Sequence, residues 1–492
     1  MNLEPQLMKK KYLLPLILLL FCYSATAQTN FLNFLTYVNT IDDPVRKTAV
    51  ADSFVNANRA AGIPLREGNM AVFLYNSNAN YVQVAGDFTS WAASVTMTRI
   101  TNTNLFYYFR SFEMTARVDY KLVINGSNWI LDPLNPRVCP GGFGPNSELA
   151  MPGYVQPWEI VRGPNLPAGT VLNYNFTSTN TSSTFAYYVY LPPGYDSNST
   201  RRYPTVYFHD GSEYLSLAQA ATILDNAIDS NRIEPVIGVF VRPNNRNNEY
   251  AGSLRNAYAA FFAQELVPYI DSRYKTIANK YKRLVLGDSY GGNISAIISW
   301  NYPEVFANCG LHSAAFQPNN YEIYNAIING ARKDIRFFSI WGTYESLFPT
   351  MRNFRDSLLA KGYTIWTKEY PEGHSWGLWR ANIMNMISWF FPGGPVSTKE
   401  GSELPKEFQL LQNHPNPFNP ETRISFTLSK PGKTTLVVYD LKGVSVAILL
   451  DRDLTAGFHT VDFKPVGLPS GIYLARLTSG KLSNTIKLVY LK

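Results

Sequence analysis

Three kinds of residue are scarce in this sequence: cysteine, histidine and charged residues. The 492 residues include three cysteines, too few for a disulfide framework or a cysteine-rich metal centre. We expect Cys139 and Cys309 to be independent thiols, although the sequence leaves open that they pair. Charged residues make up 16% of the chain, and the net charge of +8 is spread without a dense Lys/Arg cluster. A nucleic-acid partner is therefore not expected.

Long apolar runs are also scarce. The most pronounced one follows the lysines at 9–11, covers residues 12–23 and precedes small residues at 25–27. A basic end, a short apolar segment and a small-residue cleavage site are the features of a secretory signal peptide. The run is too short to span a bilayer comfortably. We therefore predict that residues 1–27 are a signal peptide and that the mature, secreted chain begins near Gln28.

Apolar and aromatic residues, by contrast, are abundant. Hydrophobic residues make up 46% of the chain and aromatic residues 14%, including 32 tyrosines. This composition is typical of folded proteins. A chain of this length exceeds what a single hydrophobic core accommodates, so we expect several domains.

The spacing of the apolar residues changes along the chain and divides it into segments. Helical spacing gives way to short runs with period two, then to alternating strands and helices, and finally, after a linker, to a second period-two region. The alternation is typical of a mostly parallel sheet with helices on both faces. The predicted fold is multidomain, with a central α/β domain flanked by two small Ig-like β-sandwiches. The predicted segments are a helical leader at 28–68, a β-sandwich at 69–154, the α/β domain at 155–392, a linker at 393–404 and the second β-sandwich at 405–492.

One short motif within the α/β segment indicates chemistry. The apolar residues 283–286 are followed by Gly287-Asp288-Ser289-Tyr290-Gly291 and then by a helix-forming run. In the strand–turn–helix that this order predicts, a Cβ at either glycine would collide with the neighbouring chain. Such a turn presents the serine hydroxyl at a helix N-terminus, where it can act as a nucleophile. A plain turn would explain the glycines but not the serine between them.

A serine nucleophile needs a general base, and the chain has five histidines. We select His374, because it follows the last predicted strand of the α/β segment, where the base of such a fold is expected. An acid must orient this histidine and stabilise the imidazolium. Glu345 is our choice because it follows the carboxyl end of its predicted strand, and Asp356 is the alternative.

Two backbone N–H groups must hold the oxyanion of the tetrahedral intermediate. We expect one from Tyr290, the residue after the nucleophile. The other is expected from Gly211, or from its neighbours Asp210 and Ser212, in the loop after "YFHDG". An ordinary strand-ending turn would also explain this loop.

Four further residues are candidates for binding the substrate. Aromatic rings at such a site can grip an acyl or aryl group, whereas Trp379 is expected to pack in the core. His312 could either line the pocket or be a core histidine with satisfied hydrogen bonds. The candidates are Asp210, Tyr214, Trp376 and His312.

With these residues in view, residues 155–392 resemble the esterase branch of the α/β-hydrolases, which contains enterochelin, feruloyl and acetylxylan esterases. The matching pieces are "YLPPGY", "YPTVYFHDG", "FFAQELVPYIDSRY", "GDSYGG", "WGTYE" and "GHSWGLWR". The resemblance implies two-step acyl transfer by Ser289, His374 and Glu345. This chemistry needs neither a metal nor an organic cofactor, and we see no metal-ligand cluster in the sequence.

The two flanking segments have resemblances of their own. "VQVAGDFTSW" and "DYKLVINGSNWILDPLNP" resemble the early-set module of isoamylases and glycogen-binding proteins, in which two tryptophans and a lysine hold the sugar. The matching positions are Trp91, Trp129 and Lys121. The resemblance leaves open whether these residues bind sugar or shape the active site. The last ninety or so residues, with "QNHPNPFNP", "VVYDLKG" and "SGIY", resemble the C-terminal sorting domain of the type IX (Por) secretion system.

The sequence thus predicts a serine carboxylic-ester hydrolase that the type IX machinery exports or attaches to the outer cell surface. The predicted substrate is a feruloyl or acetyl ester of plant polysaccharide. A siderophore trilactone of the enterochelin type and a polyester are alternative substrates. A non-catalytic, carbohydrate-binding surface protein is the alternative from a different class.

Overall fold

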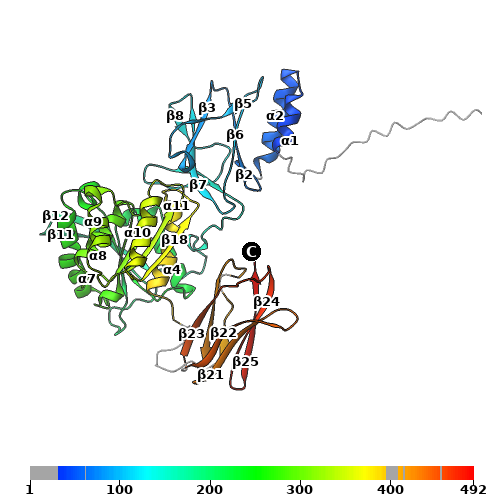
Figure 1. The fold of residues 1–492 in the computed structure, drawn as a ribbon. Helices are drawn as coiled ribbons and strands as arrows, with labels where there is room; N and C mark the ends of the chain where they lie inside the picture. The colour runs from blue at the N-terminus through cyan, green and yellow to red at the C-terminus, as the bar shows by residue number, and fades with distance from the viewer. Residues whose placement is uncertain (1–30, 61, 395–407, 414–415, 455–456, 492) are drawn as a thin grey trace, which may run out of the picture.

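The computed structural model describes residues 31–60, 62–394, 408–413, 416–454 and 457–491. The predicted signal peptide and most of the predicted linker lie outside these residues. Figure 1 shows an N-terminal module of strands and two helices, a central α/β domain and a C-terminal module of strands. Among the described residues, the structure contains no helix that is both long and apolar enough to cross a membrane.

The N-terminal module contains two antiparallel sheets that pack face to face. The first sheet has the order β1–β2–β6–β5 and the second the order β4–β3–β7–β10–β9, with β8 also paired to β7. Phe73, Val84 and Tyr120 belong to the one core between the sheets. The strand bounds are β1 Leu65–Glu67, β2 Met70–Asn76, β3 Val82–Gly86, β4 Val95–Thr96, β5 Thr98–Arg99, β6 Leu105–Ser111, β7 Arg117–Ile124, β8 Asn128–Ile130, β9 Val138–Cys139 and β10 Asn146–Ala150.

Helices α1 (Phe31–Asn39) and α2 (Pro44–Arg59) cover the outer face of the first sheet. Because side chains alternate along a strand, Val72 of β2 packs under these helices while its neighbour Phe73 enters the core between the sheets. The predicted helical leader is therefore part of this module, and it also supplies strand β1, which pairs with β2.

The central domain is built on an eight-stranded mixed sheet of order β11–β12–β14–β13–β15–β16–β17–β18. The β11–β12 and β12–β14 pairings are antiparallel, and the other five are parallel. The other sheets are antiparallel, so the sheets of the chain are largely antiparallel or mixed. The bounds are β11 Thr170–Ser178, β12 Ser183–Leu191, β13 Thr205–Phe208, β14 Ile237–Val241, β15 Arg283–Asp288, β16 Asn308–His312, β17 Arg336–Gly342 and β18 Ile365–Tyr370.

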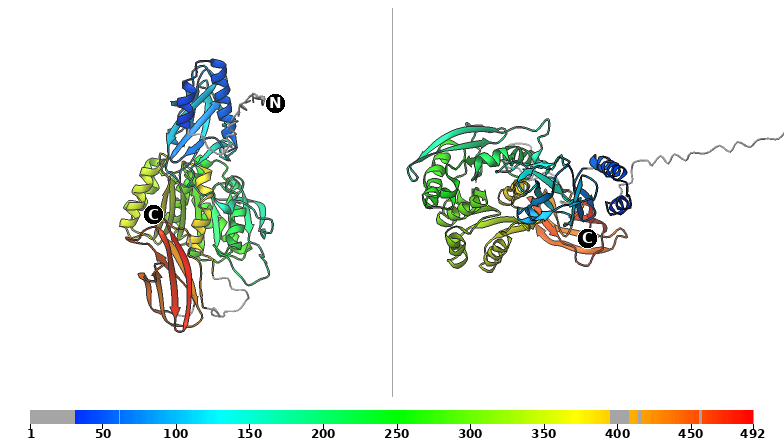
Figure 2. Two further views of the ribbon diagram at one scale, coloured as in Figure 1. Left: turned by 90° about the vertical axis from the view of Figure 1, so that its right-hand side faces the viewer. Right: turned by 90° about the horizontal axis from the view of Figure 1, so that it is seen from above.

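Two hydrophobic clusters cover the two faces of this sheet. Val285 of β15 belongs to one cluster, and its neighbours Leu284 and Leu286 belong to the other. A strand that is buried on both faces must be apolar throughout, which explains the continuous apolar run before the serine motif. Figure 2 shows the helices on both sides of the sheet. Their bounds are α3 Gly211–Ser216, α4 Ala220–Asp229, α5 Arg246–Tyr250, α6 Arg255–Ala260, α7 Val267–Arg273, α8 Tyr290–Asn301, α9 Pro318–Asn329, α10 Phe348–Ala360, α11 Trp376–Arg380 and α12 Ile383–Phe390.

The C-terminal module has two antiparallel sheets of order β19–β20–β23 and β22–β21–β24–β25, with one shared core. Its period-two pattern is visible in β21, where Leu436 and Val438 are buried and Val437 between them is partly exposed. The bounds are β19 Gln409–Leu410, β20 Thr422–Leu428, β21 Gly432–Tyr439, β22 Ser445–Leu454, β23 Gly457–Phe463, β24 Gly471–Ser479 and β25 Leu482–Tyr490.

Candidate active site

Ser289 stands at the turn between β15 and α8, above the carboxyl ends of the parallel strands. β15 ends at Asp288 and α8 begins at Tyr290, so the serine alone makes the turn. Its backbone angles, φ 53° and ψ −118°, are strained for a residue with a side chain. A Cβ on Gly287 would lie 2.4 Å from the carbonyl carbon of Gly291, so this close approach requires glycine. The predicted strand–turn–helix arrangement is present.

His374 and Glu345 meet at the carboxyl end of the sheet. His374 lies in the loop between β18 and α11, and Glu345 follows β17. A short hydrogen bond joins His374 Nδ1 to Glu345 Oε2, and the Gly342 N–H donates to Glu345 Oε1 at 2.6 Å. With both carboxylate oxygens engaged and Nδ1 occupied, Nε2 is the ring nitrogen left for proton transfer. The alternative acid, Asp356, is exposed and pairs with Arg355 instead.

Ser289 and His374 line the same cavity, which has a volume of about 560 Å³. No hydrogen bond joins these two side chains in the described part of the chain. Catalytic hydrogen bonds in unliganded enzymes are often long and shorten only when the substrate binds. Because the predicted nucleophile and base line one cavity, a single ligand in it can contact both groups.

The predicted oxyanion donors are the first residues of two helices. Gly211 begins α3 and Tyr290 begins α8, so neither N–H group has an acceptor within its own helix. Neither N–H has another acceptor among the described residues. The Asp210 N–H, which was an alternative, already donates to the Tyr250 hydroxyl at 3.0 Å. Gly211 itself is required by packing, because a Cβ there would lie 2.3 Å from the Phe240 carbonyl carbon.

The N-terminal module also lines the cavity. Trp91, Lys121 and Trp129, which the sequence marks as sugar-binding candidates, line the same cavity as Ser289. Trp129 is 44% exposed, so much of its indole is accessible to a ligand. The structure therefore brings together two groups of candidates that lie far apart in the sequence.

Three of the four predicted substrate-binding residues do not line this cavity. Tyr214 and His312 are fully buried and hydrogen-bonded to each other, with 2.9 Å between the phenol oxygen and Nδ1. Asp210 is also buried, and it accepts two hydrogen bonds from Arg246. His312 also contacts the serine turn through its backbone, because its carbonyl accepts a hydrogen bond from the Ser289 N–H at 2.9 Å. Trp376 does line the cavity.

Two further groups line the cavity, and sequence reasoning missed the second of them. Arg246 lines the cavity and joins the two turns that carry the proposed oxyanion donors, because its guanidinium donates to Asp210, which precedes Gly211, and to the carbonyl oxygen of Asp288, which precedes Ser289, at 3.2 Å. The loop 141–144 also lines the cavity and presents the exposed ring of Phe143. The "GGFG" composition of this loop, a lone aromatic ring among glycines, was the signal available in the sequence.

Burial alters the protonation of several groups beneath the site. Burial, reinforced by the nearby Asp210 carboxylate, raises the pKa of Asp288 well above its usual value. Burial lowers the pKa of His209 and of His312 to about 3, so both imidazoles are neutral at physiological pH. Neither buried histidine can therefore serve as a cation at the site. The two cysteines are separate, buried thiols.

A buried cluster of charged residues lies between the N-terminal module and the loop that carries His374. Arg117 of β7 contacts Asp119, Glu148 and Glu372 at 2.7, 2.9 and 3.7 Å. Burial raises the pKa of Glu372 to about 8, although the Arg117 charge opposes the rise. Since carboxylates outnumber guanidinium groups here, a protonated Glu372 relieves repulsion in the folded state.

This shift predicts that stability falls as the pH rises. Between the ordinary pKa of about 4.5 and the folded value of about 8, the folded state keeps the Glu372 proton that the unfolded state has lost. The free energy of unfolding should therefore decrease through this window, by at most about 1.4 kcal/mol per pH unit for one proton. Melting curves from pH 5 to 8.5, followed by tryptophan fluorescence, measure the slope. Glu372→Gln should make the decrease of stability with pH shallower, whereas the exposed Glu304→Gln should leave it unchanged. Equal slopes in the wild type and both variants would contradict the raised pKa of Glu372 as the cause.

The comparisons with known proteins agree with this architecture. Residues 178–390 match the family described as "Putative esterase", and residues 413–491 match the one described as "Secretion system C-terminal sorting domain". The esterase-family domain supports carboxylic ester hydrolase activity. The sorting domain indicates secretion and attachment to the cell surface through the type IX machinery.

Individual relatives cover different parts of the chain. The uncharacterized protein YjcH of Bacillus subtilis is 29% identical over 234 residues, which is 44% of this chain and 95% of that protein. An endo-1,4-beta-xylanase/feruloyl esterase of Xylanibacter ruminicola is 31% identical over 157 residues, covering 30% of this chain and 22% of its own length. The fold is similar to that of the enterobactin esterase of Shigella flexneri, with a TM-score of 0.58 at 18% identity over 69% of this chain and 97% of the other.

Proposed function

We propose that the chain hydrolyses aryl-acyl esters with Ser289 as nucleophile, His374 as base and Glu345 as the acid that orients the base. One observation carries this proposal. His374, hydrogen-bonded to Glu345, lines the same cavity as Ser289. In chain order the three residues run Ser, Glu, His, which is the order of the α/β-hydrolase triad.

The proposed reaction has two steps. His374 Nε2 takes the Ser289 proton as the hydroxyl attacks the ester carbonyl, and the Tyr290 and Gly211 N–H groups hold the oxyanion. His374 then protonates the departing alcohol and later activates a water that releases the acyl group. Glu345 stabilises the imidazolium that forms in each step.

The shape of the cavity favours an aromatic acyl group over acetyl. Its volume of about 560 Å³ greatly exceeds the needs of an acetyl ester. Indole and phenyl rings from both modules line it, and such rings stack on flat or sugar-like groups. A feruloyl ester of plant polysaccharide contains both a flat aromatic acyl group and a sugar. The lining rings are those of Trp91, Trp129, Phe143, Trp376 and Trp379.

A siderophore trilactone of the enterochelin type is the second candidate substrate. A solved structure of an enterobactin esterase is similar over 69% of this chain, which is more than the hydrolase segment alone, and this observation favours the candidate. The charge of the cavity favours a neutral ester, because the Arg246 guanidinium is already paired with Asp210 and only Lys121 adds a second cation to the lining. A ferric trilactone complex is anionic and would need more positive charge.

A side-by-side assay tests the function. Purified protein is incubated with methyl ferulate, feruloylated and acetylated xylan, a catecholate trilactone and a polyester film. We expect the highest kcat/KM on the feruloyl esters. Faster hydrolysis of the trilactone would select the second candidate, and no hydrolysis of any ester would contradict the enzyme.

The aromatic wall can be tested by removing one ring. Trp129→Ala should raise the KM for methyl ferulate by about 5- to 30-fold, since a lost stacking contact costs roughly 1–2 kcal/mol. Hydrolysis of p-nitrophenyl acetate should change little, because its acyl group has no aromatic ring to stack on Trp129. Trp158→Ala removes an exposed indole that does not line the cavity and serves as the matched control. An equal loss on both substrates would contradict stacking at Trp129.

The domain boundaries of the sequence analysis remain our proposal, with one change. The helical leader 28–68 and the early-set segment 69–154 form one module, and residues 155–392 form the hydrolase. Both flanking modules are proposed to be Ig-like sandwiches, on the basis of their paired antiparallel sheets. A polymeric or carbohydrate-linked ester is the proposed partner of the exposed cavity.

A further inference from the structure

The loop that carries His374 is held from outside the hydrolase domain. Arg117, at the start of β7 in the N-terminal module, pairs with this loop in the manner of a parallel strand opposite Glu372. Its backbone N–H donates to the Pro371 carbonyl at 3.0 Å. Its side-chain Nη1 donates to Ser375 Oγ, also at 3.0 Å. The contacts thus lie on both sides of His374.

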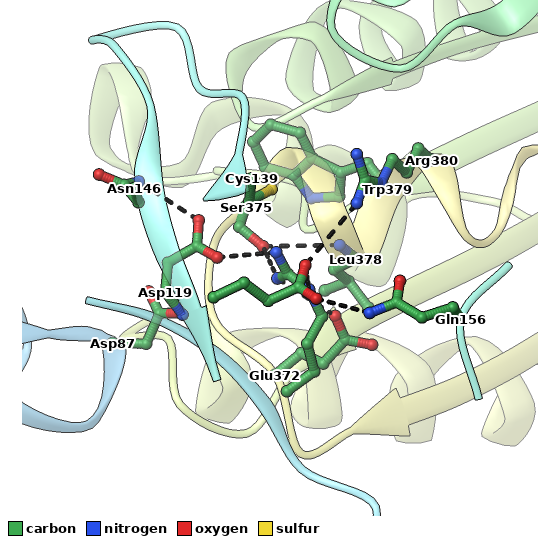
Figure 3. Close-up of polar contacts among 12 residues, drawn as sticks. Asp87, Asp119, Cys139, Asn146, Gln156, Glu372, Ser375, Leu378, Trp379 and Arg380 are labelled. Carbon is green, nitrogen blue, oxygen red and sulfur yellow. Dashed lines mark hydrogen bonds and ion pairs between the residues drawn. The ribbon is translucent and has the colours of Figure 1, made fainter. Parts of the chain in front are cut away.

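The guanidinium of Arg117 is itself held rigidly. Nε donates to Glu148 Oε2 at 2.9 Å and Nη2 donates to Asp119 Oδ1 at 2.7 Å. The side chain is fully buried, so water cannot replace these contacts. Figure 3 shows Asp119, Glu372 and Ser375 gathered around one point between the modules. The planar guanidinium group is held in one orientation by its three hydrogen-bond partners. A lysine ammonium group cannot make the same three hydrogen bonds.

Packing closes the remaining space around the loop. A Cβ on Gly373 would lie 1.9 Å from the Asp87 carboxyl carbon, and one on Gly377 would lie 2.1 Å from the Arg117 guanidinium carbon. Asp87 is fixed in turn, because it accepts hydrogen bonds from the Asp119 N–H at 2.7 Å and from Trp91 Nε1 at 3.0 Å. The N-terminal module therefore contacts the residues immediately before and shortly after His374.

The imidazole has few constraints of its own. The His374 side chain is 34% exposed, and its described contacts are the hydrogen bond to Glu345 and an edge-on ring contact with Trp379. On the hydrolase side, the Tyr344 N–H donates to the Glu372 carbonyl at 3.0 Å. The loop is thus fixed by the hydrolase on one side and by Arg117 on the other.

We propose that Arg117 is a positioning residue for the reaction, which acts through Ser375 and the adjoining loop to hold His374 in line with Ser289. This role rests on the proposed function, because it assumes that His374 is the base. It makes the N-terminal module a structural part of the active site as well as a wall of the cavity. Displacing a catalytic group by about 1 Å can lower the rate by roughly 100-fold, so a lost contact here should be visible in kcat.

A double-mutant cycle in the full chain tests the proposal. Arg117→Lys keeps the charge but not the fork, and Ser375→Ala removes the acceptor on the loop. Fluorophosphonate labelling counts the active sites, so that kcat for p-nitrophenyl acetate refers to folded enzyme. We expect each single variant to lower this kcat by about 10-fold and to change KM less than twofold. The kcat of the double variant should be at most about 20-fold below that of the wild type, because both substitutions remove the same contact. Arg99→Lys, which loses hydrogen bonds to Thr103 and Asn104 inside the N-terminal module, is the matched control and should keep the wild-type kcat.

The outcomes separate positioning from stability and from the function itself. An unchanged kcat per labelled site, with only a lower melting temperature, would show that Arg117 merely stabilises the fold and would overturn the proposal. Additive losses near 100-fold would overturn it too, because the two residues would then act independently. If the wild type hydrolyses esters and Ser289→Ala does not, the proposed function stands whatever the cycle shows.

Discussion

Replacing Ser289 by alanine is expected to lower kcat for p-nitrophenyl acetate by about 10⁵- to 10⁶-fold, to the level that the remaining groups support without a nucleophile. The reason is that no acyl-enzyme can form when the hydroxyl is absent, while the proposed oxyanion donors and the cavity stay in place. The measurement is the steady-state rate, together with the mass increase on fluorophosphonate labelling, which should vanish.

A matched serine provides the control for this variant. Ser295 lies on the same helix, α8, where its hydroxyl donates to the Gly291 carbonyl at 2.7 Å away from the cavity. Ser295→Ala should keep activity within about twofold, since it removes one hydrogen bond remote from the reacting groups. Substantial hydrolysis by Ser289→Ala, with unchanged labelling, would show that another residue is the nucleophile or that the hydrolase fold is only a scaffold for binding.

The second large effect is expected from Glu345→Gln, which should lower kcat by about 10³- to 10⁴-fold. Glutamine is nearly the same size, so the loop after β17 should keep its shape. The amide cannot stabilise the imidazolium, and its NH₂ group favours the tautomer of His374 that cannot accept the serine proton. KM should change little, because Glu345 is buried and does not line the cavity.

Two other acids test the choice of Glu345. Glu369 of β18 is held by Arg352 in a surface ion pair with N···O distances of 2.8 and 3.0 Å, and Asp356 pairs with Arg355. Glu369→Gln and Asp356→Asn should each keep at least about half of the wild-type kcat, because surface ion pairs contribute at most about 1 kcal/mol to stability. A loss in Asp356→Asn comparable to that in Glu345→Gln would transfer the role to the alternative acid.

The position of the N-terminal module connects these predictions to substrate choice. Trp91 shares the cavity with Ser289, and its indole N–H is held by Asp87, which also packs against the loop of His374. Binding a substrate ring on this wall and holding the base therefore involve one rigid group of residues. A polymeric ester could enter such a cleft between modules more easily than a closed pocket, which fits an enzyme displayed on the cell surface.

Several elements were predictable because their signals are local. The strand–turn–helix around Ser289 follows from an apolar run and two glycines, and the structure has it at the predicted residues. The helices of the leader follow from apolar spacing, and in the structure the Asp43 side chain caps α2. Glu345 could be proposed because it follows a strand that ends at the correct edge of the sheet.

Other predictions failed because burial depends on distant segments. Tyr214 was expected to bind the substrate, but its ring is buried and hydrogen-bonded to His312, which takes the second of its two predicted roles, that of a core histidine. Strand β1 was assigned to a helical leader because three residues carry too weak a pattern to detect. These residues form a strand because they pair with β2, and the residues of β1 alone do not predict that pairing.

The sequence by itself determined the modules, the serine turn and the acid–base candidates, because apolar periodicity and glycine spacing act over a few neighbouring residues. Only the tertiary structure decided that the N-terminal module closes over the hydrolase. Arg117 lies 258 residues before Ser375, and a hydrogen bond over that separation arises from the packing of two folded surfaces. The ion cluster that holds His374 in place therefore exists only once both modules have folded and met.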